Sequence, residues 1–318
     1  MIKNTIKIAL VGQPNVGKSM LINSISNARL KVGNFSGVTV SKEQVFFDYK
    51  NFHIEIVDLP GAYSLNDYTI EEKVTKDFLN NEKYDIILNV LDSTNLQRNL
   101  LLTAELLTLD KKMIIALNMS DEAEKESILI DEIQLSKILG KPCIKTSAAK
   151  KSGITKLLDE ILLKFQSQKV PSKFFFSNVI EEEIENISRV LEENKYETTE
   201  TYRQISLGLL KENKNIYKQF HDEPIWIKIQ PILTEAFEHL FIHFNSKNIK
   251  DIFNEERFAF AKGAVIETVK QKNTNTTTLT ERFDAILIHK FFGLPIFLFF
   301  MWGLFQLTFT IGNIPMEI

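Results

Sequence analysis

Residues 12–19 read Gly-Gln-Pro-Asn-Val-Gly-Lys-Ser and decide how this chain folds, because they match the phosphate-binding pattern G-x-x-x-x-G-K-S/T. The apolar run 6–11 precedes them, and the helical run 20–26 follows. In such a strand, loop and helix, backbone N–H groups cradle phosphate oxygens at the positive end of the helix. Lys18 would reach the β- and γ-phosphates, and Ser19 would hold Mg²⁺. The sequence therefore predicts a site for a nucleoside triphosphate.

Apolar runs alternate with amphipathic helical stretches up to about residue 166. The runs are 6–11, 54–57, 86–91 and 113–117. This alternation predicts an α/β domain with a mostly parallel sheet and helices on both faces. Residues 45–49 and 53–57, joined at Lys50 and Asn51, predict a hairpin that adds an antiparallel edge. Ligands of such folds bind at the carboxyl ends of the strands.

Two motifs at these strand ends indicate a guanine nucleotide. The sequence DLPG at 58–61 closes one apolar run, as D-x-x-G does in GTPases. There the aspartate orients Mg²⁺ through water, and the glycine amide contacts the γ-phosphate. The sequence NMSD at 118–121 follows another run, where GTPases carry N/T-K-x-D. The Asp121 carboxylate would accept two hydrogen bonds from guanine, and adenine would leave it unpaired.

Three further positions complete the expected nucleotide site. Thr39 is placed as the switch threonine that joins Mg²⁺ when a γ-phosphate is present. The sequence TSA at 146–148 follows a short run around Cys143 and is placed to touch guanine O6 through a backbone amide. Met119 stands where lysine is usual, so a thioether is expected to cover the base. Cys143 itself is expected to be a small buried hydrophobe.

The middle of the chain, from about 171 to 270, shows helical periodicity alone. The candidate helices are 179–193, 199–213, 225–244 and 251–269. They predict a second, small all-α domain. His239 and His243 lie four residues apart on one of these helices, close enough to share a metal ion. Because no third ligand lies nearby in sequence, helix packing is the favoured interpretation of this pair.

The end of the chain changes composition again. Residues 273–278 predict a flexible polar linker, and 291–311 carry no charged residue. A run of roughly 21 residues is long enough to cross a hydrocarbon core of about 30 Å. The alternative, a buried helix of a soluble domain, usually shows a polar stripe. Arg282, His289 and Lys290 precede the run, which favours a cytoplasmic N-terminal side.

Composition limits the remaining classes of protein. The chain has 318 residues, a net charge of −3 and one cysteine. This length fits about two domains, and the cysteine count fits a reducing cytoplasm. A negative net charge does not attract the negatively charged phosphate backbone of a nucleic acid. A nucleic-acid partner is therefore not expected.

Four stretches together resemble the FeoB family of bacterial ferrous iron transporters. They are GNFSGVTV at 33–40, DLPGAYSL at 58–65, DSTNLQRNL at 92–100 and LNMSDEA at 117–123. In that family a cytoplasmic GTPase domain and a helical domain precede a membrane permease. The expected parts of this chain are a GTPase domain at 1–168, a helical (GDI-like) domain at 169–272, a polar linker at 273–281, an interfacial segment at 282–290, a transmembrane helix at 291–311 and a tail at 312–318. The resemblance implies that a permease continues beyond Ile318.

The expected site residues follow from the motifs and the resemblance. Nucleotide contacts are expected at Gly12, Asn15, Val16, Gly17, Lys18, Ser19, Met20, Asn118, Met119, Asp121, Ser147 and Ala148. Ser19, Thr39 and Asp58 are expected to hold Mg²⁺. The catalytic set is expected to be Asn15, Lys18, Thr39 and Gly61.

Hydrolysis is expected to be slow, because Ala62 stands where many GTPases carry a water-positioning glutamine. The resemblance implies a K⁺ ion held by Asn15 with backbone carbonyls near Gly33 and Phe35. Such an ion would neutralise developing charge as an arginine finger does. The alternative is that Asn15 only caps the loop.

The resemblance implies the GTP-hydrolysing cytoplasmic portion of a ferrous iron transporter in the bacterial inner membrane. Its implied partners are the rest of the permease, the lipid bilayer, small accessory Feo-type proteins and Fe²⁺ as cargo. Two alternatives stay open. One is a potassium-activated GTPase of ribosome assembly or tRNA modification, which would need a basic RNA-binding domain. The other is a membrane-tethered GTP switch that transports nothing.

Overall fold

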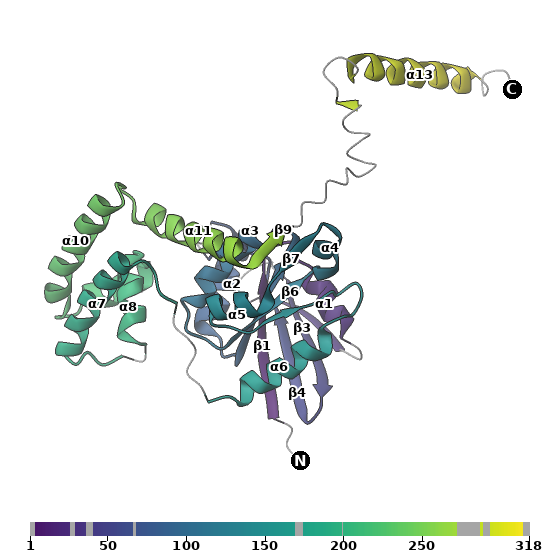
Figure 1. Ribbon diagram of the computed structural model, residues 1–318. Helices are drawn as coiled ribbons and strands as arrows, with labels where there is room; N and C mark the ends of the chain where they lie inside the picture. Colours follow the sequence, from purple (N-terminus) through teal and green to yellow (C-terminus); the bar gives the residue numbers. More distant parts are fainter. Residues whose placement is uncertain are drawn as a thin grey trace. The chain divides into compact units, whose positions relative to one another are not determined.

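The computed structural model describes residues 4–25, 29–35, 41–65, 68–168, 174–198, 200–271, 287–288 and 293–313. The chain forms two compact units, Met1–Gln271 and Lys272–Ile318. The first unit holds the sheets and the helices α1 to α11 (Figure 1).

A seven-stranded sheet with the order β2-β3-β4-β1-β5-β6-β8 organises the first unit. Its strands are β1 (Asn4–Gly12), β2 (Arg29–Asn34), β3 (Ser41–Tyr49), β4 (Phe52–Asp58), β5 (Ile86–Asp92), β6 (Met113–Asn118) and β8 (Cys143–Lys145). Pairing is parallel from β4 through β1, β5 and β6 to β8, and β3 runs antiparallel to β4. The mostly parallel sheet and the hairpin at Lys50 are confirmed. Strand β2, antiparallel to β3, adds a further edge strand that the sequence did not predict.

Helices cover both faces of this sheet, as expected. They are α1 (Lys18–Ser24), α2 (Ile70–Asn81), α3 (Leu96–Leu107), α4 (Ser120–Lys125), α5 (Glu132–Leu139) and α6 (Ile154–Gln166). On β1, Ile8 and Leu10 join a core with α1 and α6, whereas Ala9 and Val11 join a core with α2, α3 and α5. Parallel strands buried on both sides require apolar residues at consecutive positions, which explains the apolar runs of the sequence.

Five helices follow within the described residues and enclose a third core. They are α7 (Asn178–Glu193), α8 (Tyr202–Leu210), α9 (Lys214–His221), α10 (Trp226–His243) and α11 (Ile249–Thr268). The helix predicted at 199–213 corresponds to α8, and the sequence did not predict α9, which begins directly after it. Glu212 adopts a left-handed φ of 52° at the break, and the Asn213 side chain accepts a hydrogen bond from Asn215 N to begin α9.

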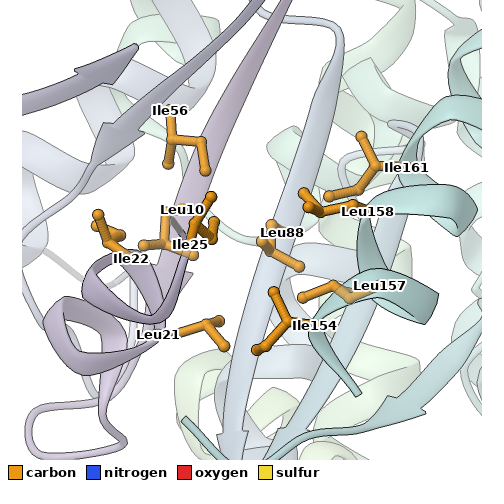
Figure 2. Close-up of a pocket in the computed structure, with 10 residues that line it drawn as sticks. All are labelled: Leu10, Leu21, Ile22, Ile25, Ile56, Leu88, Ile154, Leu157, Leu158 and Ile161. Carbon is orange, nitrogen blue, oxygen red and sulfur yellow. The ribbon is translucent and has the colours of Figure 1, made fainter. Parts of the chain in front are cut away.

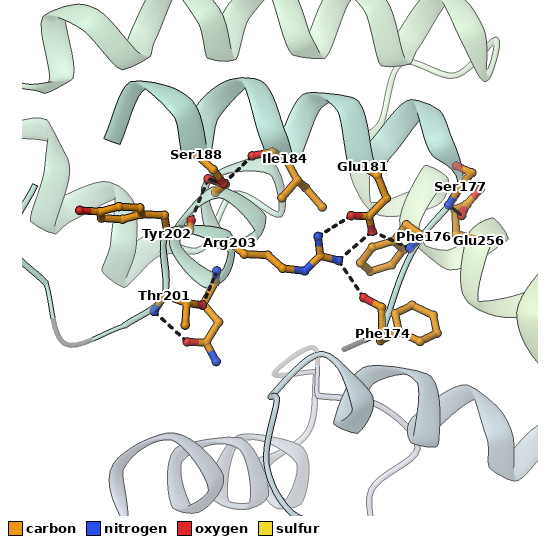
Figure 3. A network of polar contacts seen from close by, with 12 residues as sticks. Phe174, Phe176, Ser177, Glu181, Ile184, Ser188, Thr201, Tyr202, Arg203 and Glu256 are labelled. Carbon is orange, nitrogen blue, oxygen red and sulfur yellow. Dashed lines mark hydrogen bonds and ion pairs between the residues drawn. The ribbon is translucent and has the colours of Figure 1, made fainter. Parts of the chain in front are cut away.

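Arg203 fixes the entry into this helical part (Figure 3). Its guanidinium group on α8 pairs with the Glu181 carboxylate on α7 and donates to the Phe174 carbonyl at 2.7 Å. Three residues later, Ser177 N donates to Glu256 on α11 at 2.9 Å. The segment that leads into α7 is therefore held from two helices.

Helix α11 belongs to two cores at once. Ile252 and Phe253 pack in the core of the helical part, whereas Ala261 and Ala264 pack in the core that α3 and α5 cover. Strand β9 (Val269–Gln271) follows α11 and pairs antiparallel with β7 (Ile128–Ile130) in a small second sheet. The sequence did not predict this small sheet.

The second unit contains α13 (Gly293–Asn313), whose described side chains are mostly apolar and exposed. Within the described part of the chain, no helix combines the length and the apolar character needed to span a membrane. The transmembrane helix expected at 291–311 is therefore not confirmed. The linker 273–281, most of the segment 282–290 and most of the tail 312–318 lie outside the described residues.

Candidate functional site

The phosphate-binding loop connects β1 to α1, and its glycines are required by close approach. Gly17 is left-handed with φ 84°, and a Cβ there would lie 2.5 Å from Asn118 Nδ2. A Cβ at Gly12 would lie 2.6 Å from the Val90 carbonyl oxygen. Asn15 is also left-handed, with φ 66°, and is exposed at the tip of the loop. Larger residues at the two glycine positions would therefore push the loop away from its neighbours.

Lys18 and Asp58 form the charged centre of the site. Lys18 Nζ donates to the Gly12 carbonyl at 3.2 Å. Burial lowers the pKa of Lys18, and the nearby Asp58 opposes that change. Burial raises the pKa of Asp58 to about 6, although Lys18 counteracts it. Within the described part of the chain, Asp58 Oδ1 is buried without a hydrogen-bond partner. A buried carboxylate oxygen of this kind suits a hard cation such as Mg²⁺.

The DLPG segment lies directly on the phosphate-binding loop. A Cβ at Gly61 would come within 2.9 Å of Pro14 N. Ala62 N donates to the Gly12 carbonyl at 3.3 Å, and the Ala62 side chain is buried. Thr75 on α2 donates to the Pro60 carbonyl at 3.0 Å. Two strand ends that are far apart in sequence thus meet at one place.

Asn118 joins the base motifs to the phosphate-binding loop. This buried side chain donates from Nδ2 to the Val16 carbonyl at 2.9 Å. Its Oδ1 accepts from Ala148 N at 3.1 Å. Met119 is left-handed with φ 57°, and its Cε lies 3.6 Å from the position of a Cβ at Gly17. The NMSD and TSA segments and the loop therefore form a single connected site.

Asp121 is held in its ionised form. A hydrogen bond from Ser147 lowers its pKa against the opposing effect of burial, with further contributions from its own backbone N–H, from Lys150 and from Lys125. Lys150 Nζ lies 3.7 Å from Asp121 Oδ2. An ionised carboxylate can accept two hydrogen bonds from two neighbouring N–H groups of the same ligand, one at each oxygen.

The residues expected around K⁺ are only partly described. Gly33 is the second-last residue of β2, and the Phe35 ring is buried edge-on against Phe78, with 6.2 Å between the ring centroids. Thr39, the expected switch residue, lies outside the described residues. Ser19 is exposed in the first turn of α1, as a Mg²⁺ ligand requires.

Sequence reasoning missed three acidic or basic side chains that hold the segment after DLPG. Glu72 on α2 accepts from Ser64 N at 3.1 Å and from Tyr68 N at 3.2 Å. Glu105 on α3 accepts from Leu65 N and pairs with Arg257 on α11. The pattern T-x-x-E at 69–72, typical of a helix start, could have identified Glu72. No local pattern distinguishes Glu105 or Arg257.

The enclosed void of the first unit is not the ligand site. It has a volume of about 10 Å³ and lies between the sheet and helices α1 and α6 (Figure 2). Its lining is entirely leucine and isoleucine, for example Leu10, Ile22 and Leu157. Such a void stays dry and is far too small for a nucleotide.

The two histidines of α10 have different neighbours. His239 Nδ1 lies within hydrogen-bond distance of Glu183 on α7, and the His243 ring packs edge-on against Phe244. Among the described residues, no group of three His, Cys, Asp or Glu side chains could hold a metal ion.

Comparisons with known proteins cover most of the chain. The family model described as "Ferrous iron transport protein B" matches residues 6–161, and "FeoB cytosolic helical domain" matches 176–270. A Campylobacter jejuni protein named "Fe(2+) transporter FeoB" is 43% identical over 312 residues, which are 98% of this chain and 40% of that protein. The chain thus spans about two fifths of this curated relative.

Solved structures of cytosolic domains are also similar. A GDP-bound mutant of S. thermophilus NFeoB has a TM-score of 0.74 and 30% identity, covering 83% of this chain and all (100%) of that chain. The cytosolic domain of T. maritima FeoB in its GMPPNP form has a TM-score of 0.69 and 28% identity, covering 83% of this chain and 99% of that chain.

Proposed function

This chain belongs to the FeoB family of ferrous iron transport proteins, and from that premise we propose that it is the GTP-binding, GTP-hydrolysing cytoplasmic portion of an Fe²⁺ transporter. One observation carries the proposal. Asn118 hydrogen-bonds to both the phosphate-binding loop and the TSA segment, so the phosphate and base motifs form one site. The similar solved structures hold GDP and GMPPNP, which supports a guanine nucleotide here.

In this proposal the phosphates lie along the loop and the start of α1. Backbone N–H groups from Asn15 to Met20 face the phosphate oxygens, and Lys18 contacts the β- and γ-phosphates. Mg²⁺ is held by Ser19 and Thr39 directly and by Asp58 through water. The buried Asp58 Oδ1, which has no hydrogen-bond partner among the described residues, supports a cation at this point. The Gly61 amide contacts the γ-phosphate.

The guanine base is recognised by Asp121 and the TSA segment. The Asp121 carboxylate accepts from guanine N1 and N2, and the Ala148 N–H group, which donates to Asn118 Oδ1 in the structure, would share its hydrogen with O6. Met119 covers one face of the base. The ionised state of Asp121 and the position of Met119 beside Gly17 both support this arrangement.

Hydrolysis in this proposal is slow and stimulated by K⁺. The buried methyl group of Ala62 cannot orient a water molecule, so another group must stabilise the transition state. Asn15, exposed at the tip of the loop, would hold K⁺ together with the carbonyls of Gly33 and Phe35. A monovalent cation there supplies charge where an arginine finger would act.

The remaining parts are proposed from the length of the relatives and from the sequence. Residues 1–168 act as the GTPase domain and 169–272 as the helical domain, both on the cytoplasmic side of the cell membrane. The uncharged run 291–311 serves as the first membrane span, and the permease that moves Fe²⁺ follows it. Nucleotide state would regulate or power that transport.

The test of this proposal is GTP hydrolysis measured as phosphate release with Mg²⁺, in KCl and in NaCl at equal ionic strength. We expect faster release in K⁺, and Asn15→Ala should remove the difference between the two salts. Equal rates in the two salts would leave Asn15 as a structural residue. Absence of any phosphate release from GTP would contradict the proposed hydrolysis.

A further inference from the structure

Strand β8 is the last strand in the order of the seven-stranded sheet, and α5 protects its outer edge. The backbone groups of Pro142 and Thr146 bond to Ile115 and Leu117 on β6. The N–H groups between them that point the other way belong to Cys143 and Lys145. They donate to Ser136 Oγ at 2.9 Å and to Glu132 Oε2 at 3.1 Å. Side chains of α5 thus replace the missing neighbouring strand.

This match follows from the geometry of the two elements. Glu132 and Ser136 are four residues apart, which is a rise of about 6 Å along a helix. Cys143 and Lys145 are two residues apart, which is about 6.6 Å along a strand. The acceptor spacing therefore fits the donor spacing, and each bond can be tested separately.

The bond to Glu132 lies next to the proposed base-binding segment. Lys145 immediately precedes Thr146 and Ser147, whose side chains are fully buried. The carbonyl group of Lys145 is closely packed as well: Gly153 is left-handed with φ 75°, and a Cβ there would lie 2.1 Å from the Lys145 carbonyl oxygen. Glu132 therefore holds the N–H group of Lys145 and Gly153 packs against its carbonyl group, so Lys145 sets where the TSA segment begins.

The Glu132 carboxylate uses both of its oxygens. Oε2 accepts from Lys145 N, and Oε1 pairs with Lys156 Nζ at 2.9 Å. Burial would raise the pKa of Glu132, but the bonds from Lys156 and Lys145 outweigh burial and lower it. The preceding residue, Asp131, donates its N–H to the Thr268 carbonyl at the end of α11 at 2.8 Å. The start of α5 is therefore anchored to the helical part as well.

We propose that Glu132 is a positioning residue that determines how long a guanine nucleotide stays bound. The inference rests on the proposed guanine site. A bound base can leave only when the TSA segment moves away from it, and that movement must break or strain the bond from Lys145 N to Glu132. Ser136 makes an equivalent bond to Cys143 N, two residues farther from the base, so it contributes to the edge of the sheet without holding the segment.

The test is the dissociation rate of a fluorescent GDP analogue from the full chain, chased with excess GDP. Glu132→Ala is expected to speed dissociation about tenfold, the effect of losing one hydrogen bond to a charged group. Glu132→Gln keeps an oxygen acceptor and should stay within about threefold of the parent. Ser136→Ala is the matched control and should stay within about twofold. Thermal unfolding of each variant reports its stability.

The outcomes are distinct. A parent chain that does not bind the analogue would contradict the proposed guanine site. Binding by the parent, with Glu132→Ala dissociating at the parental rate, would overturn the role of Glu132. Equal acceleration by Glu132→Ala and Ser136→Ala would also overturn it, because a general loosening of the sheet edge would then explain both. If Glu132→Ala does not fold, Glu132→Leu, which also lacks an acceptor for Lys145 N, takes its place, and the proposal requires it to dissociate faster than both Glu132→Gln and Ser136→Ala.

Discussion

At the scale of single residues, Asp58 makes the site sensitive to pH. Burial raises its pKa to about 6, Lys18 opposes this, and Glu43 adds to it. Below pH 6 the carboxyl group is protonated and cannot serve Mg²⁺. We predict that the apparent Mg²⁺ affinity of the GDP complex falls about tenfold for each pH unit below 6. Mg²⁺ titrations of the complex between pH 5 and 8 measure this.

The control separates Asp58 from the titrating phosphates of GDP itself. Asp58→Asn should bind Mg²⁺ more weakly and retain only the pH dependence of the nucleotide. The raised pKa of Asp58 also predicts how the stability of the nucleotide-free protein changes with pH. Because the folded value lies above the ordinary 3.8, the Asp58 carboxylate destabilises the fold above pH 6, and acidification from 6 towards 4 relieves this. Identical Mg²⁺ profiles for parent and Asp58→Asn would contradict the assignment.

Asp121 is predicted to determine the choice of base. Asp121→Asn removes the acceptor for guanine N1 and N2 and leaves their donors unsatisfied, so GDP binding should weaken by about 1–3 kcal/mol. The new amide can donate to the C2 carbonyl of xanthine, so xanthosine diphosphate should bind the variant better than the parent does. Calorimetric titrations with both nucleotides measure the change. Unchanged GDP affinity in the variant would exclude Asp121 from base recognition.

Most of the expected site residues could be placed from the sequence, because each belongs to a short motif at a strand end. Gly12, Lys18, Asp58 and Asn118 meet as the parallel sheet requires. Glu105 and Glu132 could not be found in this way. Their roles depend on backbone N–H groups of Leu65 and Lys145, which come from other elements and leave no signature in the local sequence.

At the scale of elements, the pair Glu105–Arg257 connects the segment after DLPG to the helical part. Arg257 on α11 is mostly buried, which lowers its pKa to about 10, with Tyr68 opposing. Arg257→Ala would leave the Glu105 carboxylate buried without its cation. We predict a loss of about 3–5 kcal/mol in the free energy of unfolding. Urea denaturation of the parent and the variant measures it.

A double variant distinguishes charge from packing at this pair. Arg257→Met combined with Glu105→Gln removes both charges at similar volume, so it should be more stable than Arg257→Ala alone. Hydrogen exchange around Leu65 should increase in Arg257→Ala, because Glu105 accepts from that N–H group. If Arg257→Ala unfolds at the same urea concentration as the parent, the pair does not stabilise the contact between the two parts.

The elements that sequence periodicity predicted are the long ones. The central strands carry uninterrupted apolar runs and α10 has the apolar spacing of a helix, whereas β7 and β9 have three residues each and gain their partner only in the folded chain. Helix α11 has the periodicity of an ordinary helix. Its division between two cores could not be predicted, because one apolar stripe does not show which neighbours it meets.

At the scale of the whole molecule, the described residues of the nucleotide site lie at the carboxyl ends of the strands of the first unit. Helix α11 joins the helical part to the core on one face of the same sheet. Nucleotide state and the helical part can therefore influence each other through contacts that include Glu105–Arg257, the β7–β9 pairing and the packing of Ala261 and Ala264 against α3 and α5. If the helical part exchanges between two conformations, a nucleotide can shift that exchange only by binding one conformation more tightly than the other.

The central claim is selective binding of a guanine nucleotide by one connected site. Its most direct test is calorimetric titration of the protein with GTP and with ATP in the presence of Mg²⁺. Because only guanine offers the N1 and N2 donor pair to Asp121, we predict that GTP binds at least about a hundredfold more tightly than ATP. Equal affinity for the two nucleotides would contradict the account.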